Sequence, residues 1–341
     1  MKRVGNLYDK IISTDNLRLA DEKARRGKSR QYGVRLHDRN REENIAALHD
    51  LLRRKEFRTS PYTTFTIREP KERLIYRLPY YPDRIVHHAI MNVLEPLWVS
   101  TFIAGTYSCI KGRGIHACMQ AVDKAIRDED GARYCLKIDV RKFYPSINHD
   151  TLKQIVRRKI KCADTLALID EIIDSADGVP IGNYLSQYLA NLYLTYFDHW
   201  VKEAQRVRYY FRYADDMVFL GSDKAELHAL YRKVEAYLRD ELRLTVKDNW
   251  QVFPVARNKY DKKGRGLDFV GYVFYRKQRQ MRKSIKKNFC RACARLDKER
   301  PTRELAAYKQ AVAPWLGWAK HSDSKHLLQT ILNKQYYASI L

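Results

Sequence analysis

The chain has 341 residues, of which 45% are hydrophobic and 12% aromatic, and this content excludes wholesale disorder because a buried core can form. Its formal net charge of +25 favours a polyanionic partner, although charge alone does not separate nucleic acid from an anionic membrane. A mean hydropathy of −0.57 and the lack of any apolar run of 18 residues exclude a membrane-spanning segment.

The N-terminal part of the chain mixes helical and strand-like patterns. Apolar residues recur at helical spacing over residues 7–12 and 45–52, and the basic stretch between them, residues 23–41, suggests an irregular surface segment that could order on nucleic acid. Residues 62–78 are rich in β-branched and aromatic side chains, as in short strands. Residues 85–98 predict a helix that ends near Pro96.

The rest of the chain predicts an α+β fold with a helical C-terminal end. We expect a strand over residues 134–140, helices over 151–174 and 183–201, and a hairpin whose strands are residues 207–211 and 217–220. A last helix presents one apolar face, formed by Met281, Ile285, Phe289 and Ala292.

Three aspartates are the main candidates for chemistry. Asp215 and Asp216 are adjacent at the expected hairpin tip, where two like charges raise each other's pKa unless a cation compensates them. A solvated turn is the ordinary alternative. Asp139 ends another apolar strand, and three carboxylates on neighbouring strand ends could hold two Mg²⁺ ions about 4 Å apart, as in phosphoryl transfer.

Ordered motifs around these aspartates resemble those of reverse transcriptases. Phe211 to Asp216 resembles the YxDD box, and Lys137 to Tyr144 resembles the first catalytic block. The flanking blocks are similar as well: Arg73–Val86, Tyr107–Cys109 with Lys111–Gly114, and Leu267–Tyr272. The resemblance covers roughly residues 60–280, and the agreement in order and separation makes chance agreement improbable.

The resemblance implies roles for individual residues. Asp139 and Asp215 would be the main metal ligands, with Asp216 and Val140 beside them. Tyr144 would be the aromatic gate that excludes a ribose 2′-OH, although an ordinary core aromatic is the alternative. Lys71 and Arg73 are candidates to bind the incoming triphosphate, unless they are surface charges. Lys247 could protonate the leaving pyrophosphate as a general acid, but several other lysines compete for that role.

The block Gly178 to Gln187 indicates a branch of the family. Most reverse transcriptases have Gln where this chain has Ile181, before Gly182, and an apolar residue there, followed by Ser186 and Gln187, resembles the enzymes of diversity-generating retroelements. Those enzymes copy a template-repeat RNA with errors at adenines and work with an accessory variability determinant (Avd). A neutral replacement at Ile181 and a simple helix start at Ser186 are the alternatives.

The sequence therefore predicts an RNA-directed DNA polymerase with a right-hand fold: fingers, a palm with an antiparallel sheet, and a helical thumb. We expect an N-terminal helical extension, fingers, palm and thumb over residues 1–60, 61–135, 136–275 and 276–341. Its implied partners are template RNA, the cDNA or primer, deoxynucleoside triphosphates and Avd, in a bacterial or phage-encoded cytoplasmic setting without a membrane. The alternatives are a group II intron-like or defence-associated reverse transcriptase, and an RNA-binding protein with vestigial catalysis.

Overall fold

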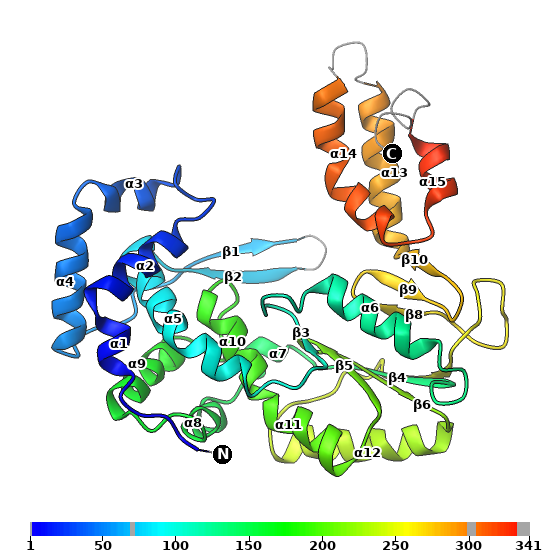
Figure 1. Cartoon of the computed structure of the whole chain (residues 1–341), viewed down its shortest axis with the longest axis horizontal. Helices are drawn as coiled ribbons and strands as arrows, with labels where there is room; N and C mark the ends of the chain where they lie inside the picture. The colour runs from blue at the N-terminus through cyan, green and yellow to red at the C-terminus, as the bar shows by residue number, and fades with distance from the viewer. Residues whose placement is uncertain (1, 69–71, 299–304, 333–341) are drawn as a thin grey trace. The chain divides into compact units, whose positions relative to one another are not determined.

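The computed structural model describes residues 2–68, 72–298 and 305–332, which form helices and mainly antiparallel strands (Figure 1). The chain divides into two compact units, each assembled from separate stretches. The first unit comprises residues 1–111, 139–206 and 232–248, and the second comprises 112–138, 207–231 and 249–341. The division into N-terminal extension, fingers, palm and thumb follows different boundaries and stays a prediction.

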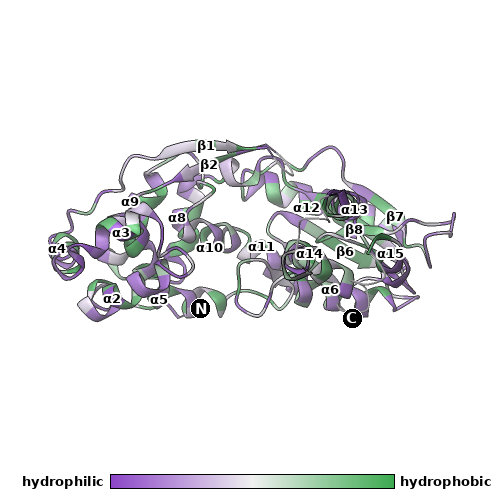
Figure 2. Cartoon of the chain, turned by 90° about the horizontal axis from the view of Figure 1, so that it is seen from above, coloured by the Kyte–Doolittle hydropathy of each residue, from purple (hydrophilic) through white to green (hydrophobic). Residues whose placement is uncertain are grey.

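Amphipathic helices build the core of the first unit. The expected N-terminal helices are present as α1 (Tyr8–Ile12) and α4 (Arg41–Arg53), and α2 (Thr14–Ala24) packs along α5 (Ile85–Val99). Their apolar residues at helical spacing, such as Leu17, are fully buried. In Figure 2 polar and apolar residues alternate along these ribbons, as this mode of packing requires.

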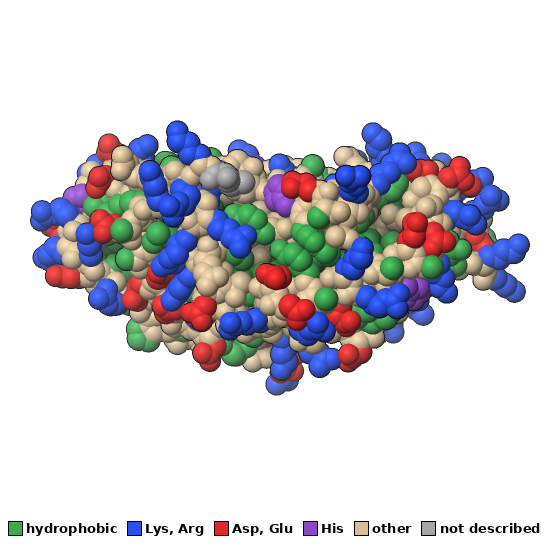
Figure 3. Space-filling model, turned by 90° about the horizontal axis from the view of Figure 1, so that it is seen from below, with side chains coloured by type: hydrophobic (Ala, Val, Ile, Leu, Met, Phe, Trp, Pro, Cys, Tyr) green, Lys and Arg blue, Asp and Glu red, His purple; other side chains and the backbone are tan. Residues whose placement is uncertain are grey.

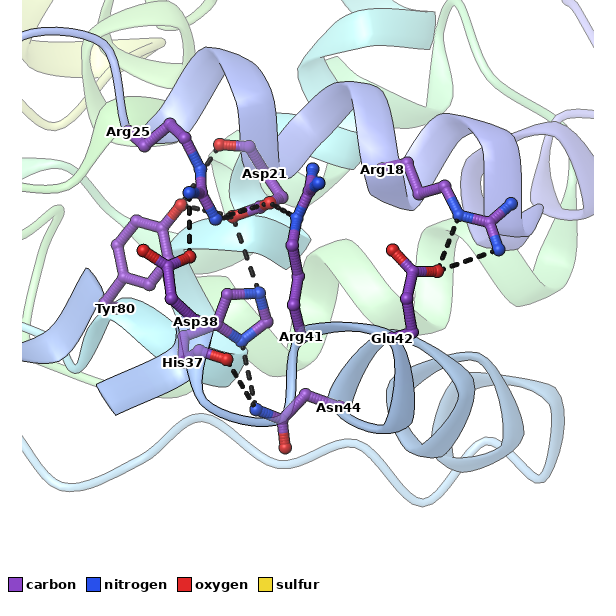
Figure 4. A network of polar contacts seen from close by, with 9 residues as sticks. All are labelled: Arg18, Asp21, Arg25, His37, Asp38, Arg41, Glu42, Asn44 and Tyr80. Atoms are coloured by element: carbon purple, nitrogen blue, oxygen red, sulfur yellow. Dashed lines mark hydrogen bonds and ion pairs between the residues drawn. The ribbon is translucent and has the colours of Figure 1, made fainter. Parts of the chain in front are cut away.

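The basic stretch 23–41 is ordered rather than irregular, which corrects our sequence prediction. It contains α3 (Tyr32–Asp38), and two of its arginines bind Asp21, whose carboxylate is fully buried (Figure 4). Asp21 accepts hydrogen bonds from Arg25, Arg41 at 2.7 Å and the Tyr80 hydroxyl at 2.5 Å. Burial alone would raise the pKa of Asp21, but these donors lower it below its ordinary value. Two basic residues of the stretch that we expected to face nucleic acid, Arg25 and Arg41, thus form hydrogen bonds to a buried carboxylate.

Replacing Asp21 with Asn should lower the free energy of unfolding by about 3 kcal/mol, because it leaves buried cationic groups without their counter-charge. Chemical denaturation of the two proteins would measure this loss. Glu42→Gln is the matched control, since Glu42 meets Arg18 at 3.0 Å with both side chains about half exposed. We expect the control to cost no more than about 0.5 kcal/mol. Equal losses from both changes would contradict the role given to Asp21.

Two strands and the long helix after them follow the sequence pattern closely. β1 (Thr63–Ile67) pairs antiparallel with β2 (Arg73–Arg77) as expected. Helix α5 does not end at Pro96 but continues to Val99. Proline removes one backbone hydrogen-bond donor from the helix. The last turn nevertheless buries Trp98 completely, and this burial stabilises the helix beyond Pro96.

The helices expected over 151–174 and 183–201 are each interrupted. The first is split into α8 (His149–Arg157) and α9 (Ala163–Asp174), because residues 159–161 pair with Val4 through two backbone hydrogen bonds of 2.8 and 2.9 Å. The second is split into α10 (Tyr184–Tyr193), α11 (Thr195–His199) and a π-helical turn, Trp200–Ala204. The hydrophobic spacing within a segment does not reveal its contacts with a distant part of the chain, so this interruption could not be predicted from the local sequence.

The sheet of the second unit carries the expected hairpin. The sheet has five strands in the order β3-β5-β6-β4-β7, with residues 106–107, 209–213, 216–221, 134–139 and 251–254 respectively. β5 pairs antiparallel with β6, and Tyr210 stacks on Phe219 across that pair. In the chain, helix α6 (Ile115–Ile126) precedes β4, and helix α12 (Lys224–Asp240) follows β6.

The C-terminal part of the second unit contains a small sheet followed by helices. β8 (Leu267–Phe269), β9 (Tyr272–Phe274) and β10 (Arg279–Met281) form an antiparallel sheet. In Figure 1, α13 (Lys283–Lys298) lies beside α14 (Leu305–Lys320) and α15 (Lys325–Ile331). The expected apolar face is confirmed at Phe289, which is buried in the core of these helices, and at Ile285, which packs against it; Met281 is buried in the same core but lies in β10 rather than in the helix.

The face of the molecule in Figure 3 is basic, but its Lys and Arg side chains do not form one continuous patch. Figure 3 shows Lys and Arg side chains spread over that face, with Asp and Glu side chains among them. Within residues 2–68, 72–298 and 305–332, every helix is too short or too polar to cross a lipid bilayer.

Candidate active site

The hairpin tip that carries Asp215 and Asp216 is a tight turn. Tyr213 pairs with Asp216 across β5 and β6, so only Ala214 and Asp215 connect the strands, and Ala214 takes a φ of 54°. Arg212 is completely buried and donates to the Ala214 carbonyl at 3.0 Å. This hydrogen bond from the buried guanidinium group fixes the backbone of the turn that leads into the two aspartates.

Asp139 is the last residue of β4, and a lysine compensates its charge. Lys247 Nζ lies 2.6 Å from Asp139 Oδ2, and the Lys247 N–H donates to the Asp139 carbonyl at 2.9 Å. Val140 pairs with Val246 beside this contact. The two backbone hydrogen bonds of that pair come from Arg141 and Lys247, so neither uses the Val140 carbonyl. Lys247 therefore lies directly beside Asp139.

Lys137 is a residue that the sequence analysis missed. Its Nζ lies 3.4 Å from Asp216 Oδ2 and donates to the Asp268 carbonyl at 2.5 Å. The signal was available: side chains two apart on a strand share a face, so Lys137 and Asp139 point to the same side of β4. A lysine on the same face as Asp139 is a signal that this face carries further carboxylates, and Asp216 is one of them.

The residues present fit a divalent cation at Asp139. Its Oδ1 atom is buried and has no hydrogen-bond partner among the described residues, while Oδ2 faces an ammonium group. A buried carboxylate oxygen without a donor is costly unless a cation binds it. Carboxylate and carbonyl oxygens are the ligands that Mg²⁺ prefers. Across the described ranges, no group of three or more His, Cys, Asp or Glu side chains is assembled as a metal site, and two of the aspartates, Asp139 and Asp216, form ion pairs with lysines.

Tyr144 lies in a short helix, α7 (Phe143–Ser146), that the glycine-containing block contacts directly. The Tyr144 carbonyl accepts a hydrogen bond from the Val179 N–H at 2.9 Å. Gly178 has a φ of +60°, and a Cβ built on it would lie 2.6 Å from the Tyr144 and Pro145 carbonyl oxygens. Only glycine allows this approach. The backbone of the half-buried Tyr144 is therefore fixed by the same block that carries Ile181.

Ile181 and Gly182 are bound to the β1–β2 hairpin. The Tyr76 N–H donates to the Ile181 carbonyl at 2.8 Å, and a Cβ at Gly182, whose φ is +128°, would lie 2.3 Å from the Tyr76 carbonyl oxygen. Arg73 begins β2 with its side chain exposed. The structure thus brings Tyr144, Ile181, Gly182 and the strand that starts at Arg73 into one region of the first unit.

The other predicted site residues are placed as follows. Ser186 is buried in the first turns of α10, and Gln187 beside it is exposed. Lys71 lies outside the described residues. Both residues lie in α10, which begins at Tyr184, and their role in copying fidelity stays a prediction.

Comparison with known proteins assigns the family. Residues 68–273 match the family described as reverse transcriptase (RNA-dependent DNA polymerase). This match covers more than half of the chain, and the protein therefore belongs to the reverse transcriptase family. The predicted α+β class with an antiparallel sheet is confirmed, and family membership gives it the right-hand polymerase fold.

The curated relatives include proteins of group II introns. Protein YkfC of Escherichia coli (strain K12) is 24% identical over 246 residues, which are 59% of this chain and 63% of YkfC. The group II intron-encoded protein LtrA of Lactococcus lactis subsp. cremoris is 25% identical over 135 residues, 36% of this chain and 22% of LtrA. Nuclear intron maturase 4, mitochondrial, of Arabidopsis thaliana is 22% identical over 178 residues, 49% of this chain and 22% of that protein. The chain spans less than two thirds of each relative's length.

Solved structures of telomerase from Candida tropicalis are also similar. The apo enzyme is 12% identical with a TM-score of 0.49, and the match covers 83% of this chain and 58% of that one. The form truncated from the C-terminal domain has the same TM-score, with 64% and 54% of the two chains covered.

Proposed function

We propose that this protein is an RNA-directed DNA polymerase that extends a primer 3′-OH with deoxynucleotides on an RNA template. The observation that carries the proposal is the family match over residues 68–273, which contains all three aspartates at or beside strand ends. The test is primer extension on RNA with Mg²⁺ and deoxynucleoside triphosphates. RNA-dependent synthesis of DNA supports the proposal, and synthesis only on DNA templates contradicts it.

Asp139, Asp215 and Asp216, together with the Val140 carbonyl, would hold two Mg²⁺ ions. When bound, these ions neutralise charge on the attacking and leaving oxygens of phosphoryl transfer. The chain's own part is to position the oxygens: a strand end fixes Asp139 and a tight turn fixes Asp215. Lys247 and Lys137 contact Asp139 and Asp216 at 2.6 and 3.4 Å, and these contacts help to position the two carboxylates.

The remaining side chains would select and orient the nucleotide. Tyr144 excludes a 2′-OH by steric contact, and Arg73 and Lys71 neutralise the triphosphate. Lys247 contacts Asp139, so it is our candidate for the acid that protonates the leaving pyrophosphate.

The finer proposal is that this enzyme makes adenine-mutagenised cDNA for a diversity-generating retroelement. Its support is Ile181 in the position before Gly182, where an amide would help to fix the nucleotide. Without that amide, correct pairs gain less transition-state binding over incorrect ones. Template-repeat RNA, cDNA and Avd are the partners that this branch implies, in a cytoplasmic bacterial or phage-encoded setting.

A group II intron-like reverse transcriptase is the second candidate, favoured by the similarity to LtrA and to an intron maturase. The two candidates differ in the product. Errors concentrated opposite template adenines support the retroelement branch, and faithful copies of an intron RNA support the group II branch.

Replacing Ile181 with Gln should reduce misincorporation opposite template adenines by about tenfold, because the restored amide adds one hydrogen bond of about 1 to 1.5 kcal/mol to the correct complex. Sequencing of extended cDNA measures the error rate. Ile181→Leu is the matched control, since it keeps an apolar side chain of the same volume. Equal error rates in Ile181→Gln and the unchanged protein would remove Ile181 from the fidelity mechanism.

A further inference from the structure

The loop that joins α9 to α10, residues 175–183, is closed at its base by one tyrosine. Tyr62 Oη lies 2.8 Å from Ser175 Oγ at the start of the loop, and Asn183 Nδ2 at its end donates to the same hydroxyl group at 3.0 Å. Compact loops with closed ends of this kind frequently carry function. Since both ends are fixed, the course of the middle of the loop, which carries Ile181, depends on other contacts.

His149 holds the middle of this loop by one peptide group. It is the first residue of α8, and its Nε2 atom lies 2.8 Å from the Gly178 carbonyl oxygen. Because a carbonyl oxygen only accepts hydrogen bonds, Nε2 carries a proton and donates it. The Val179 N–H, which belongs to the same planar peptide group, donates to the Tyr144 carbonyl at 2.9 Å. The peptide between Gly178 and Val179 is therefore held on both edges, by His149 and by α7.

The His149 ring is oriented by the end of α9. Its Nδ1 lies 3.3 Å from Asp174 Oδ1, and Lys153 Nζ lies 2.5 Å from Asp174 Oδ2. Helix α8 packs against both α9 and α10 (Figure 1), the two helices that flank the loop. The His149 side chain is 25% exposed, whereas that of Asp174 is 52% exposed. Exposed ion pairs contribute little, so the hydrogen bond to Gly178 is the contact with the larger effect.

The backbone at His149 is fixed independently of the loop. Asn148 caps α8 by accepting a hydrogen bond from the Thr151 N–H at 3.1 Å, and the Asn148 N–H donates to the Tyr193 hydroxyl at 3.3 Å. Tyr193 is completely buried and donates to the Leu242 carbonyl at 2.6 Å. An anchored helix start thus presents His149 to the loop, and replacing the imidazole leaves that anchor in place.

We propose that His149 is a positioning residue for nucleotide selection, which acts through the Gly178–Val179 peptide and not by touching the nucleotide. This peptide joins the loop that carries Ile181 to the helix that carries Tyr144, so its orientation sets how the two residues lie relative to each other. Without the imidazole donor the peptide can turn, and its hydrogen bond to the Tyr144 carbonyl weakens. The inference rests on the proposed function, which assigns the selection of sugar and base to Tyr144 and Ile181.

The experiment compares His149→Asn with His149→Gln in single-nucleotide extension, with dATP and ATP measured separately. The Gln amide nitrogen can reach the place of Nε2 and still donate to Gly178, whereas the shorter Asn cannot. We expect His149→Asn to raise the KM for dATP and the relative incorporation of ribonucleotide about fivefold, because one hydrogen bond is lost. The kcat for dATP should change less than about twofold, since the hydrogen bond is remote from the reacting atoms. His149→Gln should retain the values of the unchanged protein.

His199 provides the matched control. Its Nε2 lies 2.8 Å from the Thr101 carbonyl oxygen and its Nδ1 lies 2.6 Å from Glu203 Oε1, so this ring has the same kinds of partner away from the loop. We expect His199→Asn to leave the KM and the sugar ratio unchanged. Equal changes in His149→Asn and His199→Asn would overturn the inference, because they would reflect a general loss of stability.

Hydrogen exchange over residues 175–183 measures the loop without substrate or metal. Exchange at the Val179 amide should be about fivefold faster in His149→Asn and unchanged in His149→Gln. Unchanged exchange in His149→Asn, or an unchanged sugar ratio in a variant that still extends primers, would overturn the inference. If even the unchanged protein extends no primer, the proposed function fails, and the exchange rates still decide whether His149 fixes this peptide.

Discussion

Replacing Asp139 with Asn should slow RNA-templated primer extension by about 1,000-fold or more, with the fold retained. Asparagine offers one neutral oxygen where the carboxylate offers charge, and it therefore holds a divalent cation much more weakly. The buried Oδ1 and the Lys247 contact at Oδ2 leave the aspartate well placed for such a role. A factor of 1,000 corresponds to about 4 kcal/mol of lost transition-state stabilisation, which is of the size that metal binding supplies.

Single-turnover extension at saturating Mg²⁺ measures this effect. Asp240→Asn is a matched control, because Asp240 is exposed and pairs with its neighbour Arg239 at 2.7 Å. We expect the control to extend primers at the rate of the unchanged protein. A decrease of less than tenfold in Asp139→Asn would show that this carboxylate is not a metal ligand.

Replacing Tyr144 with Ala should raise the incorporation of ribonucleotides relative to deoxyribonucleotides by roughly 100-fold. The Tyr144 backbone is fixed by the Val179 N–H and by the close approach of Gly178, and these contacts do not depend on the nucleotide. Removing it opens the space that a 2′-OH would occupy. Competition between dATP and ATP on one template, followed by alkaline hydrolysis of the product, measures the ratio.

Tyr144→Phe provides the control for this experiment, since it keeps the ring and loses only the hydroxyl. It should retain the sugar selectivity of the unchanged protein. If Tyr144→Ala loses activity with both sugars equally, the ring is a core aromatic, which is the alternative that the sequence left open.

Local patterns were sufficient for the elements that carry the aspartates. Alternating apolar residues place Asp139 at the end of β4, and the two β-rich runs around Ala214 and Asp215 form the expected hairpin. The helix through Phe289 was likewise visible from its apolar face. These elements depend on residues near one another in the chain, which is the information that periodicity holds.

The features that escaped prediction depend on distant partners. Val4 interrupts the helix expected over 151–174, and Asp21 orders the basic stretch 23–41 through Arg25, Arg41 and Tyr80. The contact between Tyr76 and Ile181 joins residues more than a hundred positions apart. No local propensity encodes which of many basic side chains will meet one buried carboxylate.

The most direct test of the central claim replaces Mg²⁺ with Fe²⁺ and lets ascorbate and peroxide generate hydroxyl radicals at the bound metal. If Asp139, Asp215 and Asp216 share the metals, backbone cuts should appear both near residue 139 and near residues 215–216, and Asp139→Asn should suppress both sets. Cuts at only one of these segments, or a pattern that Asp139→Asn leaves unchanged, would contradict the account.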